Sequence, residues 1–169
     1  NKLFSMDGAL PYLQYDDYKI DSSYMSMNSS ADLLKIAVVT NGIKYSAVDL
    51  HKAILNTSVK DGLFNWDIDL FKSSDNINYK LKGNLLNDSA YWVLQLNEQQ
   101  LLNAENWQVS ANNEIRVNKN SPGFHSDIVI NSGTKKLSAK SASTGEGLPL
   151  VVEVNEFPVS TLTKLIETD

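Results

Sequence analysis

The sequence predicts a mostly β protein: an antiparallel sandwich or jelly-roll-like body with one or two short helices and an extended N-terminal arm. Three observations predict this fold class. Apolar and polar residues alternate over several short stretches, turn-forming pairs separate those stretches, and the first 30 residues show neither pattern. We therefore divide the chain into an arm or irregular segment, residues 1–30, and a β-rich domain, residues 31–169. A flattened barrel is the alternative body.

The arm is unusual in composition. It contains all three methionines of the chain but few aliphatic residues, and aspartates and serine pairs interrupt its apolar positions. It also contains four of the seven tyrosines, namely Tyr12, Tyr15, Tyr18 and Tyr24. Tyrosine and methionine are enriched at protein interfaces, so these four tyrosines are candidates for partner binding. The alternative is that the arm covers an open sheet edge of its own domain.

The first hairpin signal follows the arm. An apolar run, residues 35–40, precedes Asn41-Gly42, and a second run covers residues 43–48. Asn-Gly between two such runs favours a two-residue turn with positive φ. Asp49 then suits the N-cap of a short helix that reaches about Leu55.

Residues 63–71 show the clearest strand pattern. Apolar side chains fall on one face, and Asn65, Asp67 and Asp69 fall on the other. The remaining strands are expected at 77–81, 91–96, 107–117 around Asn112-Asn113, 127–140 around Ser132-Gly133, and 148–154. The spacing of Asn97 and Gln100 is that of a capping box for a brief helical turn, and residues 162–166 suit a terminal helix.

Composition excludes several classes of function. The chain has 169 residues, a formal net charge of −5 and no cysteine. Its basic residues do not cluster, so we expect no nucleic-acid partner. No apolar run approaches the roughly 20 residues that span a bilayer, so we expect no membrane insertion. The 18 asparagines reflect either an AT-rich genome or an exterior selected for hydrogen-bonding side chains.

Chemistry-bearing residues are sparse. Asp67 and Asp69 are one strand period apart on the polar face and could contact a ligand or a cation. His125 lies between two serines and before Asp127, but neighbours in sequence rarely form a catalytic relay. We keep Asp67, Asp69 and His125 as ligand contacts or, alternatively, as hydrolase residues. We predict no catalytic residue, no metal ligand and no cofactor.

The sequence therefore favours a non-catalytic binding or assembly module over an enzyme. We expect it on a cell surface, in a secreted protein or in a phage or virion structure, recognising a glycan, a receptor or a neighbouring subunit. A homo-oligomer is possible. A hydrolase that uses His125 or the Asp67/Asp69 carboxylate pair is one alternative. A purely structural subunit of a pilus, coat or virion is the other.

Overall fold

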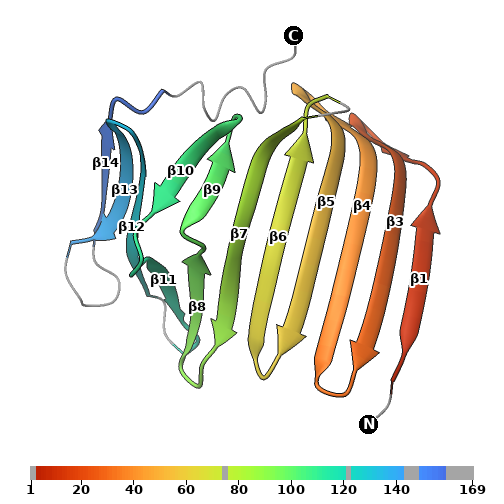
Figure 1. Ribbon diagram of the computed structural model, residues 1–169, viewed down its shortest axis with the longest axis horizontal. Helices are drawn as coiled ribbons and strands as arrows, with labels where there is room; N and C mark the ends of the chain where they lie inside the picture. The colour runs from red at the N-terminus through yellow and green to blue at the C-terminus, as the bar shows by residue number, and fades with distance from the viewer. Residues whose placement is uncertain (1–2, 74–75, 121–122, 143–148, 159–169) are drawn as a thin grey trace.

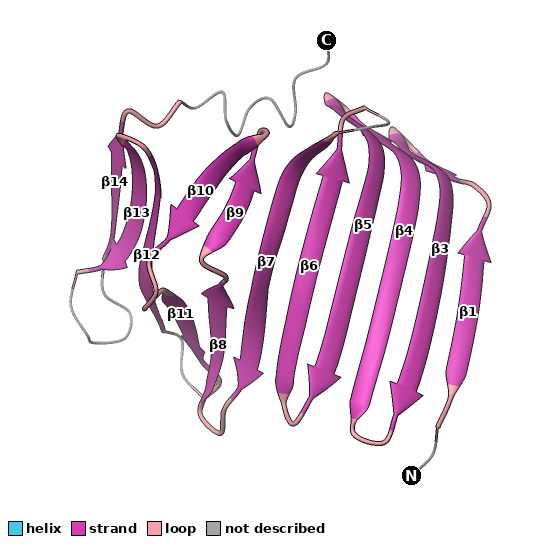
Figure 2. Ribbon diagram, in the orientation of Figure 1, coloured by secondary structure: helices cyan, strands magenta, loops and turns pink. Residues whose placement is uncertain are grey.

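The computed structural model describes residues 3–73, 76–120, 123–142 and 149–158. In this part of the chain every regular element is a strand, and the strands form antiparallel pairs within one sheet (Figures 1 and 2). The strands are β1 (Ser5–Leu10), β2 (Leu13–Tyr15), β3 (Tyr18–Ser30), β4 (Leu33–Tyr45), β5 (Val48–Lys60), β6 (Leu63–Phe71), β7 (Ile77–Asn87), β8 (Tyr91–Leu96), β9 (Gln99–Leu102), β10 (Glu105–Val109), β11 (Glu114–Asn118), β12 (Phe124–Ser132), β13 (Lys135–Ser141) and β14 (Leu150–Asn155).

Strands β3 to β7 form a meander of long neighbouring strands, with β1 beyond β3 at the sheet edge (Figure 1). Tight turns connect the strands. Between β5 and β6, Asp61 and Gly62 have φ values of 49° and 77°. Positive φ at both central residues is typical of a type I′ turn, whose twist matches that of the flanking strands. This turn sets the register in which Lys60 lies opposite Leu63.

Beyond β7 the sheet divides. The C-terminal half of β7 pairs with β8, and Lys80 in its N-terminal half lies opposite Leu101 of β9. The sheet continues from β8 through β11 to β12, and β12 pairs with both β10 and β13. Figure 1 shows the meander nearly flat-on and β12 to β14 turned more edge-on, so the sheet curls at this end. The outermost strand there is β14, and among the described strands it pairs only with β13.

The core lies inside this curl and is small. Its buried apolar residues are Tyr79, Leu102, Trp107, Val109, Ile130 and Phe157. The rings of Trp107 and Phe157 lie 5.0 Å apart between centroids, and Trp107 is 1% exposed. Val109, two residues further along β10, is also 1% exposed. Trp92 is 41% exposed and Val151 46%, so these two apolar side chains lie at the surface although they belong to strands.

The meander has two chemically different faces. Residues that lie opposite one another in neighbouring antiparallel strands project to the same face. One row across β3 to β8 is polar and consists of Asn28, Lys35, Ser58, Asn65, Asn84 and Gln95. The adjacent row, on the opposite face, consists of Met27, Ile36, Thr57, Trp66, Gly83 and Leu96. We call these the polar face and the apolar face.

The expected helices are absent from the described residues. The segment from Asp49 to Leu55 belongs to β5, and the Asn97–Gln100 segment leads into β9. The helix was expected because Leu50, Ala53 and Ile54 stand at helical spacing. This short local pattern is outweighed by the two neighbouring strands, β4 and β6, that pair with β5. The expected helix at 162–166 lies outside the described residues. The two packed sheets of a sandwich or jelly roll are not confirmed, because all the strands belong to one sheet.

Residues 5–30, where the sequence predicts an arm, lie in the sheet as β1, β2 and β3. Strand β3 pairs with β4 on one side and with β1 and β2 on the other. The prediction of a hairpin turn at Asn41-Gly42 is wrong, because β4 continues through these two residues to Tyr45. Gly42 has φ 57°, and the Asp21 side chain occupies the space that a Cβ at Gly42 would need. The glycine is therefore required inside a strand and not in a turn.

Candidate functional site

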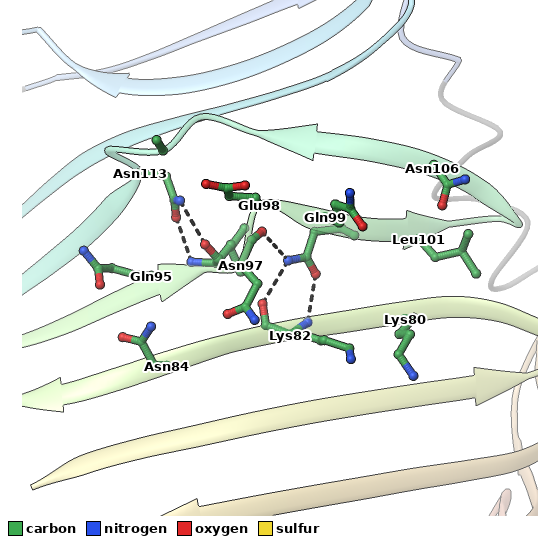
Figure 3. A pocket seen from close by; sticks show the side chains of 13 residues that line it. Lys80, Lys82, Asn84, Gln95, Asn97, Glu98, Gln99, Leu101, Asn106 and Asn113 are labelled. Carbon is green, nitrogen blue, oxygen red and sulfur yellow. Dashed lines mark hydrogen bonds between the residues drawn. The ribbon is translucent and has the colours of Figure 1, made fainter. Parts of the chain in front are cut away.

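A polar hollow of about 740 Å³ opens where β7, β8, β9 and β10 meet (Figure 3). Seven of its 13 lining residues carry a side-chain amide: Asn84, Gln95, Asn97, Gln99, Gln100, Asn106 and Asn113. The others are Lys80, Lys82, Glu98, Leu96, Leu101 and Ala111. A second hollow, of about 560 Å³, lies over β3 to β7 and shares Lys82 and Asn97 with the first.

Two buried amides build the wall of the first hollow. The side-chain oxygen of Gln100 accepts a hydrogen bond from the backbone N–H of Lys82 (2.8 Å), and its Nε2 donates to the Lys82 carbonyl (2.9 Å). Gln100 is 4% exposed. It therefore replaces the backbone of a strand neighbour at the point where β8 has ended. Its Nε2 also donates to the Asn97 carbonyl (2.7 Å). Asn97 and Gln100, which the sequence pattern paired as a helix capping box, therefore do contact each other, but in a turn between two strands and not at the start of a helix.

Asn113 does the same for β8. Its Oδ1 accepts from the backbone N–H of Leu96 (2.7 Å), and its Nδ2 donates to the carbonyls of Leu96 (2.9 Å) and Ser110 (2.8 Å). Asn113 is 3% exposed. Figure 3 shows the amide of Asn113 turned toward the backbone. Because their hydrogen-bonding groups are occupied, these two residues hold the hollow open and are not its ligand contacts.

The other five amides have free side chains. Asn84, Gln95, Asn97, Gln99 and Asn106 make no side-chain hydrogen bond to any described residue. Each offers two donors and one acceptor oxygen. The hollow is thus a concave surface on which uncommitted hydrogen-bonding groups converge.

Asp67 lines the second hollow, and lysines pair with both Asp67 and Asp69. Lys80 Nζ lies 2.8 Å from Asp69 Oδ1 and donates to Oδ2 at 3.0 Å. Lys82 Nζ lies 3.0 Å from Asp67 Oδ2. The hydrogen bond to Asp69, followed by the nearby charge of Asp67, raises the pKa of Lys80. The predicted carboxylate pair therefore exists, but as half of a four-residue charge ladder across β6 and β7.

His125 lies apart from those carboxylates, on β12 opposite Arg116 of β11. Its Nδ1 is buried and has no hydrogen-bond partner among the residues that the structure describes. The hydroxyl of the neighbouring Ser126 donates to the Ala139 carbonyl at 2.8 Å, and Ser126 is 4% exposed. The serine is thus committed to the backbone and has no geometry for attack on a substrate. No group of three or more His, Asp or Glu side chains suitable for a metal ion occurs among the described residues.

The four predicted tyrosines do not form one site. Tyr15 lies opposite Tyr18, and Tyr18 stacks on Tyr45 of β4, with ring centroids 3.8 Å apart and planes at 8°. This row of three exposed rings includes Tyr45, which the sequence did not single out. Tyr12 donates to Gln14 Oε1 at 2.5 Å.

Tyr24 is separate from that row, because it lies opposite Val39 and Ala9 in the neighbouring strands. Its hydroxyl donates to Asp7 Oδ1 at 2.7 Å, and this hydrogen bond raises the pKa of Tyr24. The exposed fractions of the four predicted tyrosines are 51% for Tyr12, 75% for Tyr15, 47% for Tyr18 and 49% for Tyr24.

The outer strand β14 is exposed along its whole length. Its sequence, LVVEVN, has apolar side chains on both faces, and Val152 and Val154 are 54% and 57% exposed. Its one charged residue, Glu153, lies 3.5 Å from Lys136 Nζ and accepts from Ser138 Oγ at 3.3 Å, both in the neighbouring strand β13. Natural edge strands usually carry lysine, proline or a bulge that prevents pairing. Strand β14 has none of these.

No family model matches the chain, and neither a curated protein nor a solved structure matches it. The candidate site therefore stands on its geometry alone. Sequence reasoning missed the amide-lined hollow and the outer strand as a site. The seven amides come from six strands or turns that only the sheet brings together. The apolar run 148–154 was predicted to be a strand, but its place at the edge of the sheet could not be predicted.

Proposed function

We propose that this protein is a non-catalytic assembly module that binds a neighbouring protein subunit by strand addition, and that this subunit is a second copy of the chain. The observation that carries the proposal is the exposed strand β14. A strand that offers unpaired backbone groups and apolar side chains is a template for another strand. Two copies related by a two-fold axis would pair their β14 strands antiparallel, as a closed isologous dimer requires.

Charge does not oppose this pairing. Glu153 is the one ionised residue of β14, and Lys136 and Ser138 of the same chain already contact its carboxylate. Two such strands therefore approach without a bare negative charge on either side. The opposite edge of the sheet is less suited, because β1 contains Asp7 and Gly8 near its centre.

The apolar face supports an assembly role independently. Phe64, Trp66 and Ile68 are half-buried, although they line one face of β6. Leu70, further along the same face, packs against the core, whereas the other three side chains keep partial contact with solvent. Contiguous apolar surface of this kind usually marks an interaction site. The Asn- and Ser-rich exterior is the feature that supports placing such an assembly on a cell surface, in a secreted structure or on a virion.

The hydrolase alternative has less support. Both carboxylates of the Asp67/Asp69 pair are engaged by lysines, and His125 lies on another strand beside a serine that is bonded to the backbone. To act as a general acid or base, a side chain must be free to exchange a proton with a substrate within hydrogen-bond distance.

The experiment is sedimentation velocity over a wide concentration range. We expect the wild type to reach twice the 18.8 kDa chain mass, and the double variant Val152→Lys/Val154→Lys to stay monomeric. Val117→Lys is the matched control: Val117 is 45% exposed but lies on β11, which has a neighbour on both sides. A monomeric wild type at the highest concentration would contradict the proposal. A native mass spectrum that shows one chain with a bound apolar small molecule, and no dimer, would also contradict it.

A further inference from the structure

We propose that the two polar hollows form one continuous groove that binds an uncharged saccharide. Lys82 and Asn97 line both hollows, so the two hollows are adjacent. Together they extend over the polar face from β3, where Asn28 lines the second hollow, to β10, where Asn106 lines the first. Neighbouring strands lie about 4.8 Å apart, so side chains of this face recur at roughly the spacing of sugar units in an extended chain.

The lining has the hydrogen-bonding character that sugars require. Each hydroxyl of a sugar both donates and accepts, and a primary amide does the same. Five amides of the first hollow have uncommitted side chains, and Asn65 and Asn56 line the second. Gln100 and Asn113 fix the backbone beneath them, so a ligand meets a wall that is already formed.

The charges select against an ionic ligand. Lys80 and Lys82 are held by Asp69 and Asp67 and cannot bind a phosphate or sulfate without breaking those pairs. The remaining lining charges are Lys35 in one hollow and Glu98 in the other, which sum to zero. A neutral, hydroxyl-rich molecule is the ligand that this balance fits.

This groove does not depend on the proposed assembly. It lies over β3 to β10, whereas the subunit contact is assigned to β14. The β14 double variant should therefore keep saccharide binding, and the groove variants should keep the dimer. If either proposal fails, the other can still be tested with its own variants.

The test is a titration of the ¹⁵N-labelled protein with neutral hexasaccharides of glucose, mannose and N-acetylglucosamine, with a heparin-derived hexasaccharide as the anionic probe. We expect at least one neutral probe to shift the side-chain NH₂ signals of Asn84, Asn97 and Asn106. Asn97→Ala and Asn106→Ala should each weaken that binding about tenfold, the equivalent of one or two lost hydrogen bonds. Asn41→Ala, an exposed amide outside both hollows, should leave it unchanged.

Three results would overturn the proposal. The first is that no neutral probe shifts these signals at millimolar concentration. The second is that the anionic probe binds as well as the best neutral one. The third is that Asn97→Ala and Asn106→Ala bind like Asn41→Ala. Asn97 and Asn106 are exposed, and their side chains make no hydrogen bond to the described residues, so the variants should fold; an unchanged backbone spectrum checks this.

Discussion

The indole ring of Trp66 occupies the space that a side chain at Gly83 would need. The two residues lie opposite each other in β6 and β7, and a Cβ built on Gly83 would fall 2.6 Å from Cζ2 of the indole. The carbonyl of Gln95 approaches the same point from β8. A bare glycine in a sheet leaves its backbone uncovered, and an aromatic side chain on the neighbouring strand covers it. The tryptophan and the glycine therefore form one packing unit of the apolar face.

Gly83→Ala should destabilise the protein by about 1–3 kcal/mol, because the added methyl overlaps both the indole and a backbone carbonyl. Urea unfolding followed by tryptophan fluorescence measures the change. Gly8→Ala is the control, since the nearest atom to its added methyl is 3.9 Å away, and it should be close to neutral. Equal stability of the two variants would show that Trp66 moves aside at little cost.

Asn113→Asp should destabilise by about 2–5 kcal/mol at neutral pH, because a buried carboxylate would replace an NH₂ group that donates to two carbonyl oxygens. The loss should shrink at low pH, where the new carboxyl can hold a proton and donate again. Asn112→Asp, which adds the same charge at the exposed neighbouring position, should have little effect. The measurement is the urea midpoint of each variant at pH 4 and pH 7. Matching midpoints for the two variants at pH 7 would mean that Asn113 does not fasten β8.

Glu105 should contribute an acid-sensitive part of the stability. Lys135 Nζ donates to both carboxylate oxygens (2.7 and 2.8 Å), and this contact, with a hydrogen bond from Ser132, lowers the pKa of Glu105. Because the folded-state pKa is lowered, this stabilisation is complete above the ordinary carboxyl value of 4.5 and disappears as pH falls through the lowered value.

Melting temperatures between pH 7 and pH 3 test this contribution. The wild type should lose stability more steeply below pH 4.5 than Glu105→Gln. Glu98→Gln, at an exposed residue without an ion pair among the described residues, should follow the wild-type curve. Parallel curves for the wild type and Glu105→Gln would show that the ion pair adds nothing to stability.

Local pattern predicted the β class because strand alternation is a local property. The period-two pattern around Trp66 placed its face correctly, and Ser132-Gly133 marked a true hairpin between β12 and β13. The same rules failed at Asn41-Gly42, because the reason for that glycine is Asp21 on the neighbouring strand, a contact between distant residues. Positive φ favours glycine in turns and in strands alike, so the dipeptide alone cannot distinguish them.

The candidate site was beyond local reasoning for a similar reason. Gln100 and Asn113 act on Lys82 and Leu96, and only the division of the sheet after β7 brings these residues together. Residues 18–30 showed no clear strand pattern in the sequence, because β3 contains few aliphatic residues and many serines. Its pairing is decided by the long strand β4 beside it and not by its own burial pattern. The position of β14 at the sheet edge is likewise a property of topology.

Hydrogen exchange of the β14 amides as a function of protein concentration tests the proposed assembly most directly. At low concentration these amides should exchange rapidly wherever they face the open edge, while those of β5, paired on both sides, are protected. At high concentration the account predicts protection across residues 150–155 in the wild type, no gain in Val152→Lys/Val154→Lys, and a normal gain in Val117→Lys. Residues 150–155 that exchange equally fast at every concentration would contradict it.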